Sequence, residues 1–302
     1  MTTEISHSCS ACTGEMAHFF ETHDFNRLVS DEKFRYARCV QCGQISLVNV
    51  PKDLGRYYTP GYHMIPESEA AIEAGVAHDR YKIDLVRQFS TTGRLLEIGP
   101  AWGAFSLLAK RAGFSVETIE MDPACREFLK SRLGIPAIKC NDEADAVTEA
   151  SAPDVVAAWH VFEHLRDPWR LLDRVAKHLA PGGIVVLALP NPGAFQFSIL
   201  RRLWAHVDAP RHVHLIPPAV LRSRAKAVGL EQILCTTTDS GSLSWNRFGW
   251  QYSLPHLSRN ATVKRALRLA GRVVATVLAP IENREGRGSA YTAVFRKLRR
   301  TS

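Results

Sequence analysis

The sequence predicts an α/β fold in which helices cover a mainly parallel sheet, and three observations support this prediction. Residues 95–98 form an apolar run that ends in a glycine turn and continues into a helical pattern over residues 104–112. Further apolar runs at residues 115–121, 154–160 and 184–189 read as strands separated by amphipathic segments. Hydrophobic residues make up 46% and charged residues 23% of the 302 residues, which is ordinary for a globular protein.

The glycine turn after the first of these strands carries the pattern E-x-G-x-x-x-G. Glu97 stands two residues before Gly99, and Gly103 closes the pattern. A dinucleotide-binding loop instead reads G-x-G-x-x-G, and its glycines bring a pyrophosphate to a helix N-terminus. A carboxylate just before the turn favours a cationic ligand over a diphosphate.

At these residues the chain resembles the class I S-adenosylmethionine (SAM) methyltransferases, whose first motif has this form. The resemblance continues in register over residues 90–235: Glu120 ends the second strand, and Leu-x-Pro-Gly-Gly at 179–183 precedes the fifth. The run WHVFEH at 159–164 is similar to that of the ubiquinone-type O-methyltransferases and of small-molecule enzymes. The resemblance implies a Rossmann-like sheet of seven strands whose last strand, residues 288–298, is antiparallel.

The resemblance also implies the reaction and the cofactor. The chain is expected to transfer a methyl group from SAM to a small-molecule acceptor, with oxygen as the favoured target, in a biosynthetic pathway. The residues expected to bind SAM are Glu97, Gly99, Pro100, Gly103, Glu120, Met121, Asp142 and His160. Glu120 would hold the ribose hydroxyls, and Asp142 would accept from the adenine amino group. An ordinary polar loop is the alternative for Asp142.

Two histidines after the fourth strand are candidates for the catalytic base. His160 and His164 are four residues apart, so they share a face if residues 161–165 are helical. Imidazole titrates near neutrality and therefore suits proton removal from an acceptor hydroxyl. A supporting histidine bonded to backbone is the alternative for His164.

The acceptor side is expected to include residues 208–215, where an acid, an arginine and two histidines lie beside a proline. The candidates there are Arg211, His212 and His214, and the alternative is a connector held by an Asp208–Arg211 ion pair. The resemblance places Tyr57, Tyr58 and Tyr62 over the cofactor mouth, although all three could simply pack a linker. Residues 240–257, rich in aromatic residues, serine and glycine, are predicted to be a pocket-lining loop.

Four cysteines near the N-terminus form two C-x-x-C pairs, Cys9 with Cys12 and Cys39 with Cys42. Four thiolates can fill the tetrahedral coordination of Zn²⁺, which leaves no open position and predicts a structural metal. The alternatives are a redox pair, for which the surrounding βαβ pattern is missing, and four unrelated thiols. A module of this size lacks the apolar core to fold without such a metal.

These features predict three regions. Residues 1–55 form a zinc-ribbon-like domain, and residues 56–92 form a linker with a flanking helix at 70–89. Residues 93–302 form the methyltransferase domain, with acceptor-side insertions near 193–216 and 240–285.

The net charge of +8 is compatible with an anionic partner such as nucleic acid, a membrane surface or a phosphorylated substrate. Four cations, Lys264, Arg265, Arg268 and Arg272, lie in one predicted helix at 261–281. No RNA-binding module is recognisable, so no nucleic-acid partner is expected. The apolar stripe of this helix consists mostly of small residues, which favours covering the acceptor pocket over stable membrane insertion.

A cytoplasmic location is expected, because the sequence shows no export signal and no apolar run long enough to span a bilayer. Two other functions stay open at this point: methyl transfer to RNA, and SAM binding without catalysis in a scaffold protein. The oligomeric state is not predicted.

Overall fold

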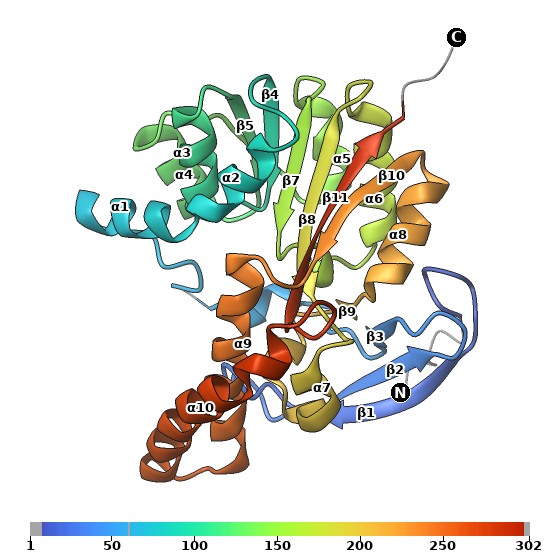
Figure 1. Ribbon diagram of the computed structural model, residues 1–302, viewed down its shortest axis with the longest axis vertical. Coiled ribbons are helices and arrows are strands. Elements are labelled where there is room, and N and C mark those ends of the chain that lie inside the picture. The colour runs from blue at the N-terminus through green and yellow to red at the C-terminus, as the bar shows by residue number, and fades with distance from the viewer. Residues whose placement is uncertain (1–7, 60, 299–302) are drawn as a thin grey trace.

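The computed structural model describes residues 8–59 and 61–298. Its larger sheet has seven strands in the order β10-β11-β8-β7-β4-β5-β6 (Figure 1). The strands are β4 (Arg94–Ile98), β5 (Ser115–Glu120), β6 (Ala137–Lys139), β7 (Val155–Trp159), β8 (Ile184–Pro190), β10 (Leu230–Thr236) and β11 (Ala290–Lys297). Only β11 runs antiparallel to its neighbours β8 and β10. This confirms the predicted Rossmann-like α/β sheet and its antiparallel last strand.

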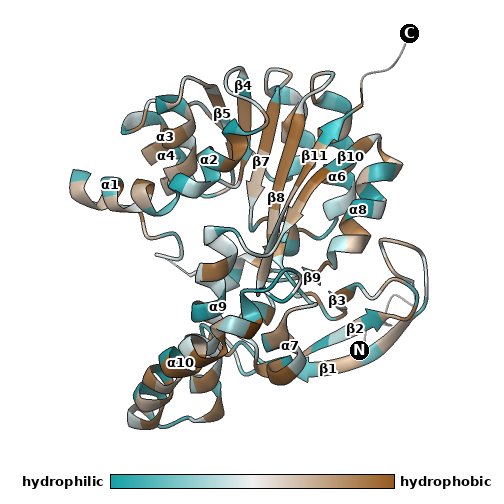
Figure 2. Cartoon of the chain, viewed as in Figure 1, coloured by the Kyte–Doolittle hydropathy of each residue, from teal (hydrophilic) through white to brown (hydrophobic). Residues whose placement is uncertain are grey.

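Helices cover both faces of this sheet. One face carries α1 (Glu69–His78), α2 (Arg80–Arg87), α3 (Ala104–Arg111) and α4 (Pro123–Ser131), and the other carries α5 (Glu143–Ala146), α6 (Pro168–His178) and α8 (Pro218–Ala227) (Figure 1). Neighbouring residues of β4 divide between the two cores: Leu95 packs with the first group, and Leu96 packs with the second. That alternation follows from the two-residue period of a strand, and it explains why strands β7 and β8, covered on both faces, consist of apolar residues (Figure 2).

The single helix predicted over residues 70–89 is instead two helices. Asp79 separates α1 from α2, and its backbone leaves the helical region at φ −89° and ψ 2°. Its carboxylate accepts a hydrogen bond from Lys82 Nζ at 2.6 Å. The apolar spacing continues across this break, so periodicity alone did not reveal it.

A second difference concerns residues 240–257, which were predicted as a loop. They form α9 (Ser240–Ser253) followed by the short 3-10 turn η6 (Leu254–Leu257). The Asp239 carboxylate caps α9 by accepting from the Ser242 N–H at 2.8 Å. The glycines and serines suggested a loop, but an N-cap and the packing of aromatic residues outweigh their low helix propensity.

The smaller sheet combines the N-terminal segment with a distant strand. Its order is β1 (Met16–Thr22), β2 (Phe34–Cys39), β3 (Ile45–Leu47) and β9 (His214–Leu215). Against one face of this sheet, Phe34 and Tyr36 pack in one apolar core with Phe197 and Trp204 of the insertion after β8. The N-terminal segment and the acceptor-side insertion therefore pack as one layer.

The other elements of the insertions complete this layer. They are α7 (Phe195–Leu200), the 3-10 turns η4 (Arg201–Leu203) and η5 (Ala205–Val207), and α10 (Ala261–Glu282), which packs on α9. Three further 3-10 turns are η1 (Gly55–Tyr57), η2 (Val147–Glu149) and η3 (Phe162–His164). Within residues 8–59 and 61–298, no helix has the length and apolar content that crossing a membrane requires.

Candidate functional site

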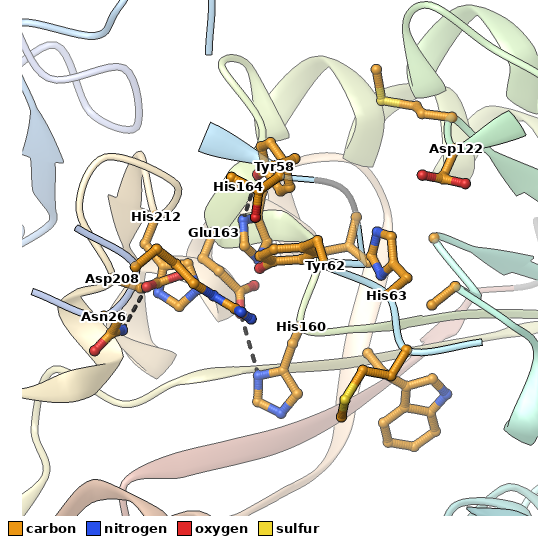
Figure 3. A pocket seen from close by; sticks show the side chains of 18 of the residues that line it. Asn26, Tyr58, Tyr62, His63, Asp122, His160, Glu163, His164, Asp208 and His212 are labelled. Carbon is orange, nitrogen blue, oxygen red and sulfur yellow. Dashed lines mark hydrogen bonds and ion pairs between the residues drawn. The ribbon is translucent and has the colours of Figure 1, made fainter. Parts of the chain in front are cut away.

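A cavity of about 2280 Å³ opens at the carboxyl ends of β4, β5 and β7. The turns after these strands form one wall, and residues from the segment after η1 and from α9 form the other (Figure 3). Ligands of parallel α/β sheets bind at this edge, where the strand order reverses on either side of the first strand. The cavity is therefore the candidate active site.

The glycine turn after β4 has room for no side chain at two positions. Gly99 has φ +65°, and a Cβ there would lie 2.8 Å from Val161 Cγ2. Gly103 has φ +91°, and a Cβ there would overlap Leu129 Cδ2. Of the turn residues, Gly99 lines the cavity. Pro100, which is buried, and Gly103 do not line it and belong to the side of the turn that faces the protein.

The two acids of the motif lie at different depths. Glu97 is buried behind the turn, where it accepts a hydrogen bond from the Ser106 hydroxyl, and burial raises its pKa to about 7. Glu120 lines the cavity and accepts from the N–H groups of Ala101 at 2.9 Å and Asp122 at 2.8 Å. Burial raises the pKa of Glu120 to about 7 as well. Glu120 thus holds the glycine turn in shape from the neighbouring strand.

The other predicted cofactor residues lie at the rim of the same cavity. Met121 is half-exposed after β5, and Asp142 follows β6. The Asp142 carboxylate caps α5 and forms an ion pair with Arg170 at 2.7 Å, so it is already engaged in the local structure. Carboxylates beside a turn that opens with a glycine fit a ligand with a cationic centre and ribose hydroxyls, as SAM has.

His160 lies at the end of β7 with its ring in the cavity, against Trp245 at 4.9 Å between ring centroids. Its backbone is left-handed, with φ +57°, which is unusual for a residue with a side chain. Nδ1 lies 3.3 Å from Oε1 of Glu163, whose side chain is fully buried (Figure 3). Burial opposes ionisation of Glu163, yet the hydrogen bond and charge of His160 keep its pKa below the usual value.

His164 faces the cavity from the other side of Glu163. Its Nδ1 lies 2.9 Å from the Tyr58 hydroxyl and 3.1 Å from the Arg211 carbonyl oxygen. Burial lowers its pKa to about 4, so the ring is neutral at physiological pH. His212 packs edge-on against it, with 4.5 Å between ring centroids. His164 therefore has the contacts expected of the alternative, a supporting histidine bonded to the backbone.

Three predicted acceptor-side residues do not line the cavity. Tyr57 is buried against Phe34 in the core of the smaller sheet. Arg211 is buried between two carboxylates, with Nη2 2.7 Å from both Asp24 and Asp208, so the ion-pair alternative is the correct one. His214 lies on β9, where Nδ1 is 2.9 Å from the Ser46 hydroxyl.

These corrections share one cause. The charged and aromatic residues of segment 208–215 attach the insertion to the N-terminal segment, which the sequence did not show as a neighbour. Of the predicted acceptor-side residues, Tyr58 and His212 line the cavity.

Sequence reasoning missed Glu163, which lines the cavity together with Tyr62 and Trp245, two residues of segments that were already predicted to lie there. Glu163 had a visible signal, because an acid flanked by two candidate histidines could orient either of them. Tyr62 packs edge-on against Tyr58 at 4.9 Å. Trp245 belongs to segment 240–257, which lines the cavity as predicted but as a helix and not as a loop.

The four N-terminal cysteines converge at the end of the smaller sheet. Sγ atoms lie 3.7 Å apart for Cys9 and Cys42 and 3.5 Å apart for Cys12 and Cys39, and all four lie within 4.8 Å of one another. A Zn–S distance of about 2.3 Å gives tetrahedral S···S edges of about 3.8 Å. This arrangement suggests a zinc site with four thiolate ligands.

Comparison with known proteins identifies the family of the chain. A family described as "Methyltransferase domain" matches residues 76–234. A ubiquinone biosynthesis O-methyltransferase from Pseudoalteromonas translucida is 30% identical over 170 residues, which cover 53% of this chain and 70% of that one. The enzyme of the same name from Bordetella avium is 27% identical over 149 residues, covering 46% and 62%.

Solved structures share the fold. Phosphoethanolamine N-methyltransferase 2 from Haemonchus contortus, in complex with SAM, has a TM-score of 0.54 at 16% identity and covers 84% of this chain and 62% of its own. A SAM-dependent methyltransferase from Archaeoglobus fulgidus has a TM-score of 0.51 at 17% identity, covering 75% and 94%. With the family match, the seven-stranded sheet and its glycine turn, the chain belongs to the class I SAM-dependent methyltransferases.

Proposed function

We propose that the protein transfers a methyl group from SAM to an oxygen atom of a small-molecule acceptor in a biosynthetic pathway. The observation that carries this proposal is the pair formed by His160 and the buried Glu163 in the cavity. A carboxylate that holds an imidazole in place is the arrangement by which a histidine removes a proton from a hydroxyl. The names of the O-methyltransferase relatives agree with oxygen as the target.

In this proposal the cofactor binds along the carboxyl edge of β4 and β5. Gly99, Glu120 and Met121 would contact it directly, while Glu97, Pro100 and Gly103 would shape the turn from behind. Asp142 would lie at the adenine end, and His160 at the end where the methyl group is transferred. Bound SAM supplies an electrophilic methyl group on its sulfonium.

The protein's own residues then have two tasks. Glu163 keeps the His160 ring oriented through Nδ1, so that Nε2 can accept the proton of the acceptor hydroxyl. The aromatic side chains Tyr58, Tyr62 and Trp245 line the acceptor side, where they exclude water and hold a flat or apolar acceptor in line with the methyl group. His164, neutral and bonded to Tyr58, acts as a positioning residue for that tyrosine.

We also propose that the four-cysteine cluster holds a structural zinc ion. Residues 1–55 would then form the zinc-binding module, residues 56–92 the linker with its flanking helices, and residues 93–302 the catalytic domain. The module is anchored to the larger sheet's helices: Trp169 Nε1 of α6 lies 3.2 Å from the Ser10 hydroxyl, and Arg224 of α8 donates to the Ala11 carbonyl at 3.4 Å.

The test uses isotope-labelled SAM and an extract of small molecules from the source cells, followed by identification of the labelled product. We expect a labelled methyl ether or ester. His160→Gln should lower the transfer rate by about two to four orders of magnitude while the Kd for SAM changes less than about threefold. A labelled N-methyl or C-methyl product would contradict the oxygen target.

His178→Gln provides the matched control. This histidine lies on α6 outside the cavity, with Nε2 2.8 Å from the Ala150 carbonyl, and its loss should leave the transfer rate unchanged. If the wild-type rate persisted in His160→Gln, alignment of the acceptor rather than proton removal would be the main source of catalysis.

A further inference from the structure

We propose that Glu163, His164 and His212 form a binding site for a divalent transition-metal ion, distinct from the four cysteines. A carboxylate oxygen of Glu163 and one ring nitrogen of each histidine lie within 4.8 Å of one another. The three side chains come from η3 and from the insertion that leads into β9, and they converge on one wall of the cavity (Figure 3). One residue of the insertion thus meets two neighbouring residues of η3, and each of the three offers a metal-ligand atom.

The carboxylate supplies the first argument. Glu163 has 0% of its surface exposed, and its Oε1 interacts with His160. Its second oxygen, Oε2, has no hydrogen-bond partner among the residues that the structure describes. A buried anionic oxygen without a partner is strongly destabilising. A cation on Oε2 would remove that cost and leave the contact with His160 intact.

The two imidazoles supply the second argument. Nδ1 of His212 lies 2.8 Å from the His206 carbonyl oxygen, and Nδ1 of His164 lies 3.1 Å from the Arg211 carbonyl oxygen. A carbonyl can only accept, so both Nδ1 atoms carry the proton and both Nε2 atoms keep a lone pair. Metal-ligating histidines are oriented in this way by an outer hydrogen bond.

The backbone that carries these carbonyls is itself fixed. Both carbonyls belong to residues 206–211, and the buried ion pairs of Arg211 with Asp24 and Asp208 hold this segment. Asn26 Nδ2 adds a hydrogen bond to the Ala205 carbonyl at 2.8 Å. A rigid outer layer of this kind lets the histidines keep their geometry before an ion binds.

The ligand set points to a class of metal. Two imidazoles and one carboxylate suit Zn²⁺, Co²⁺, Fe²⁺ or Mn²⁺, whereas Mg²⁺ and Ca²⁺ prefer oxygen ligands alone. Three protein ligands leave coordination positions open to the cavity. These open positions would bind an acceptor oxygen, an assignment that rests on the proposed function. An acceptor with two adjacent oxygens would bind best, because both oxygens can coordinate the same ion.

The site is tested on the full chain, in the absence of SAM and of any acceptor. Metal is removed with a chelator, and Co²⁺ is then added while the absorption spectrum is recorded. We expect two classes of bound Co²⁺: one with thiolate charge-transfer bands from the cysteines, and a second with d–d bands alone. Glu163→Gln should weaken only the second class, by at least about tenfold.

Two further variants make the result interpretable. His212→Asn should act like Glu163→Gln, and the control His178→Gln should keep both classes of Co²⁺. Thermal unfolding in chelator shows whether each variant folds, and a variant that does not fold is replaced by His164→Gln. Adding catechol should shift the d–d bands of the second class, since its two adjacent oxygens enter the open positions.

One bound Co²⁺ per chain, on the cysteines alone, would overturn the proposal. Equal binding of the second Co²⁺ by wild type and by all folded ligand variants would overturn it too, because the ion would then be adventitious. Neither result depends on methyl transfer, so a failure of the proposed function would leave this measurement unaffected.

Discussion

The depth at which Glu97 is buried leads to a prediction about stability and pH. Burial places the pKa of this carboxyl at about 7, against a usual value of 4.5. The folded chain therefore holds the proton more tightly than the unfolded chain does. Its stabilising effect is complete below pH 4.5 and is lost as the pH rises through about 7. Replacement by glutamine, which stays neutral, should abolish this loss.

The magnitude follows from the two pKa values. A difference of about 2.5 between them corresponds to a total of about 3 kcal/mol once the pH is well above 7. Between pH 5 and pH 8 the part that is lost amounts to about 2.5 kcal/mol. Relative to wild type, Glu97→Gln should therefore gain about 2.5 kcal/mol in the free energy of unfolding over this interval. Glu120, which titrates in the same range and whose charge contributes to the raised pKa of Glu97, is present in both proteins.

The assay is urea unfolding of wild type and Glu97→Gln at pH 5 and pH 8, without cofactor. The control Ser106→Ala removes the hydroxyl that donates to the carboxylate but keeps the carboxylate itself, so its loss of stability with pH should be at least as large as in wild type. A stability difference that is the same at both pH values would refute the reasoning.

Three shorter predictions follow from other parts of the structure. Purified protein should contain about one zinc ion bound to the cysteines, and Cys39→Ser should lose it, as elemental analysis before and after a chelator wash will show. Gly103→Ala should lower the free energy of unfolding by about 1–3 kcal/mol, because φ is +91° and Leu129 occupies the space; a neutral effect in urea unfolding would argue against strain. Arg211→Met should lower it by about 3–5 kcal/mol, since the Asp24 and Asp208 carboxylates stay buried without their cation. Adding Asp24→Asn should recover part of that loss, and no recovery would show that packing, not charge, is what Arg211 supplies.

Most of the larger sheet could be predicted from the sequence because its strands are short apolar runs bounded by turn residues. The predicted strand 184–189 differs from β8 by one residue, and so does the predicted helix 261–281 from α10. The break between α1 and α2 at Asp79 was not predicted, because the apolar spacing of the sequence continues through it. Local sequence patterns predict helices and strands well when the tertiary contacts favour the same conformation as the pattern does.

The candidate site was less predictable, for a physical reason. Glu120 ends β5 and His160 directly follows β7, so the topology alone brings them to the cavity. Arg211 and His214 were assigned to the acceptor because charged residues are rare in cores, yet both find partners from the N-terminal segment. Whether a polar residue faces a ligand or a distant segment depends on long-range packing, which spacing does not encode.

The strand that completes the smaller sheet has a consequence for how the chain is made. Ser46 of β3 lies beside His214 of β9, 168 positions later in the sequence. During synthesis the N-terminal strands leave the ribosome long before their last partner exists, so the edge of β3 and the aromatic residues beneath it stay uncovered. Ion capture by the cysteines needs residues 9–42 alone. A metal bound at that stage would hold the early strands together and keep them from pairing with other chains until β9 arrives.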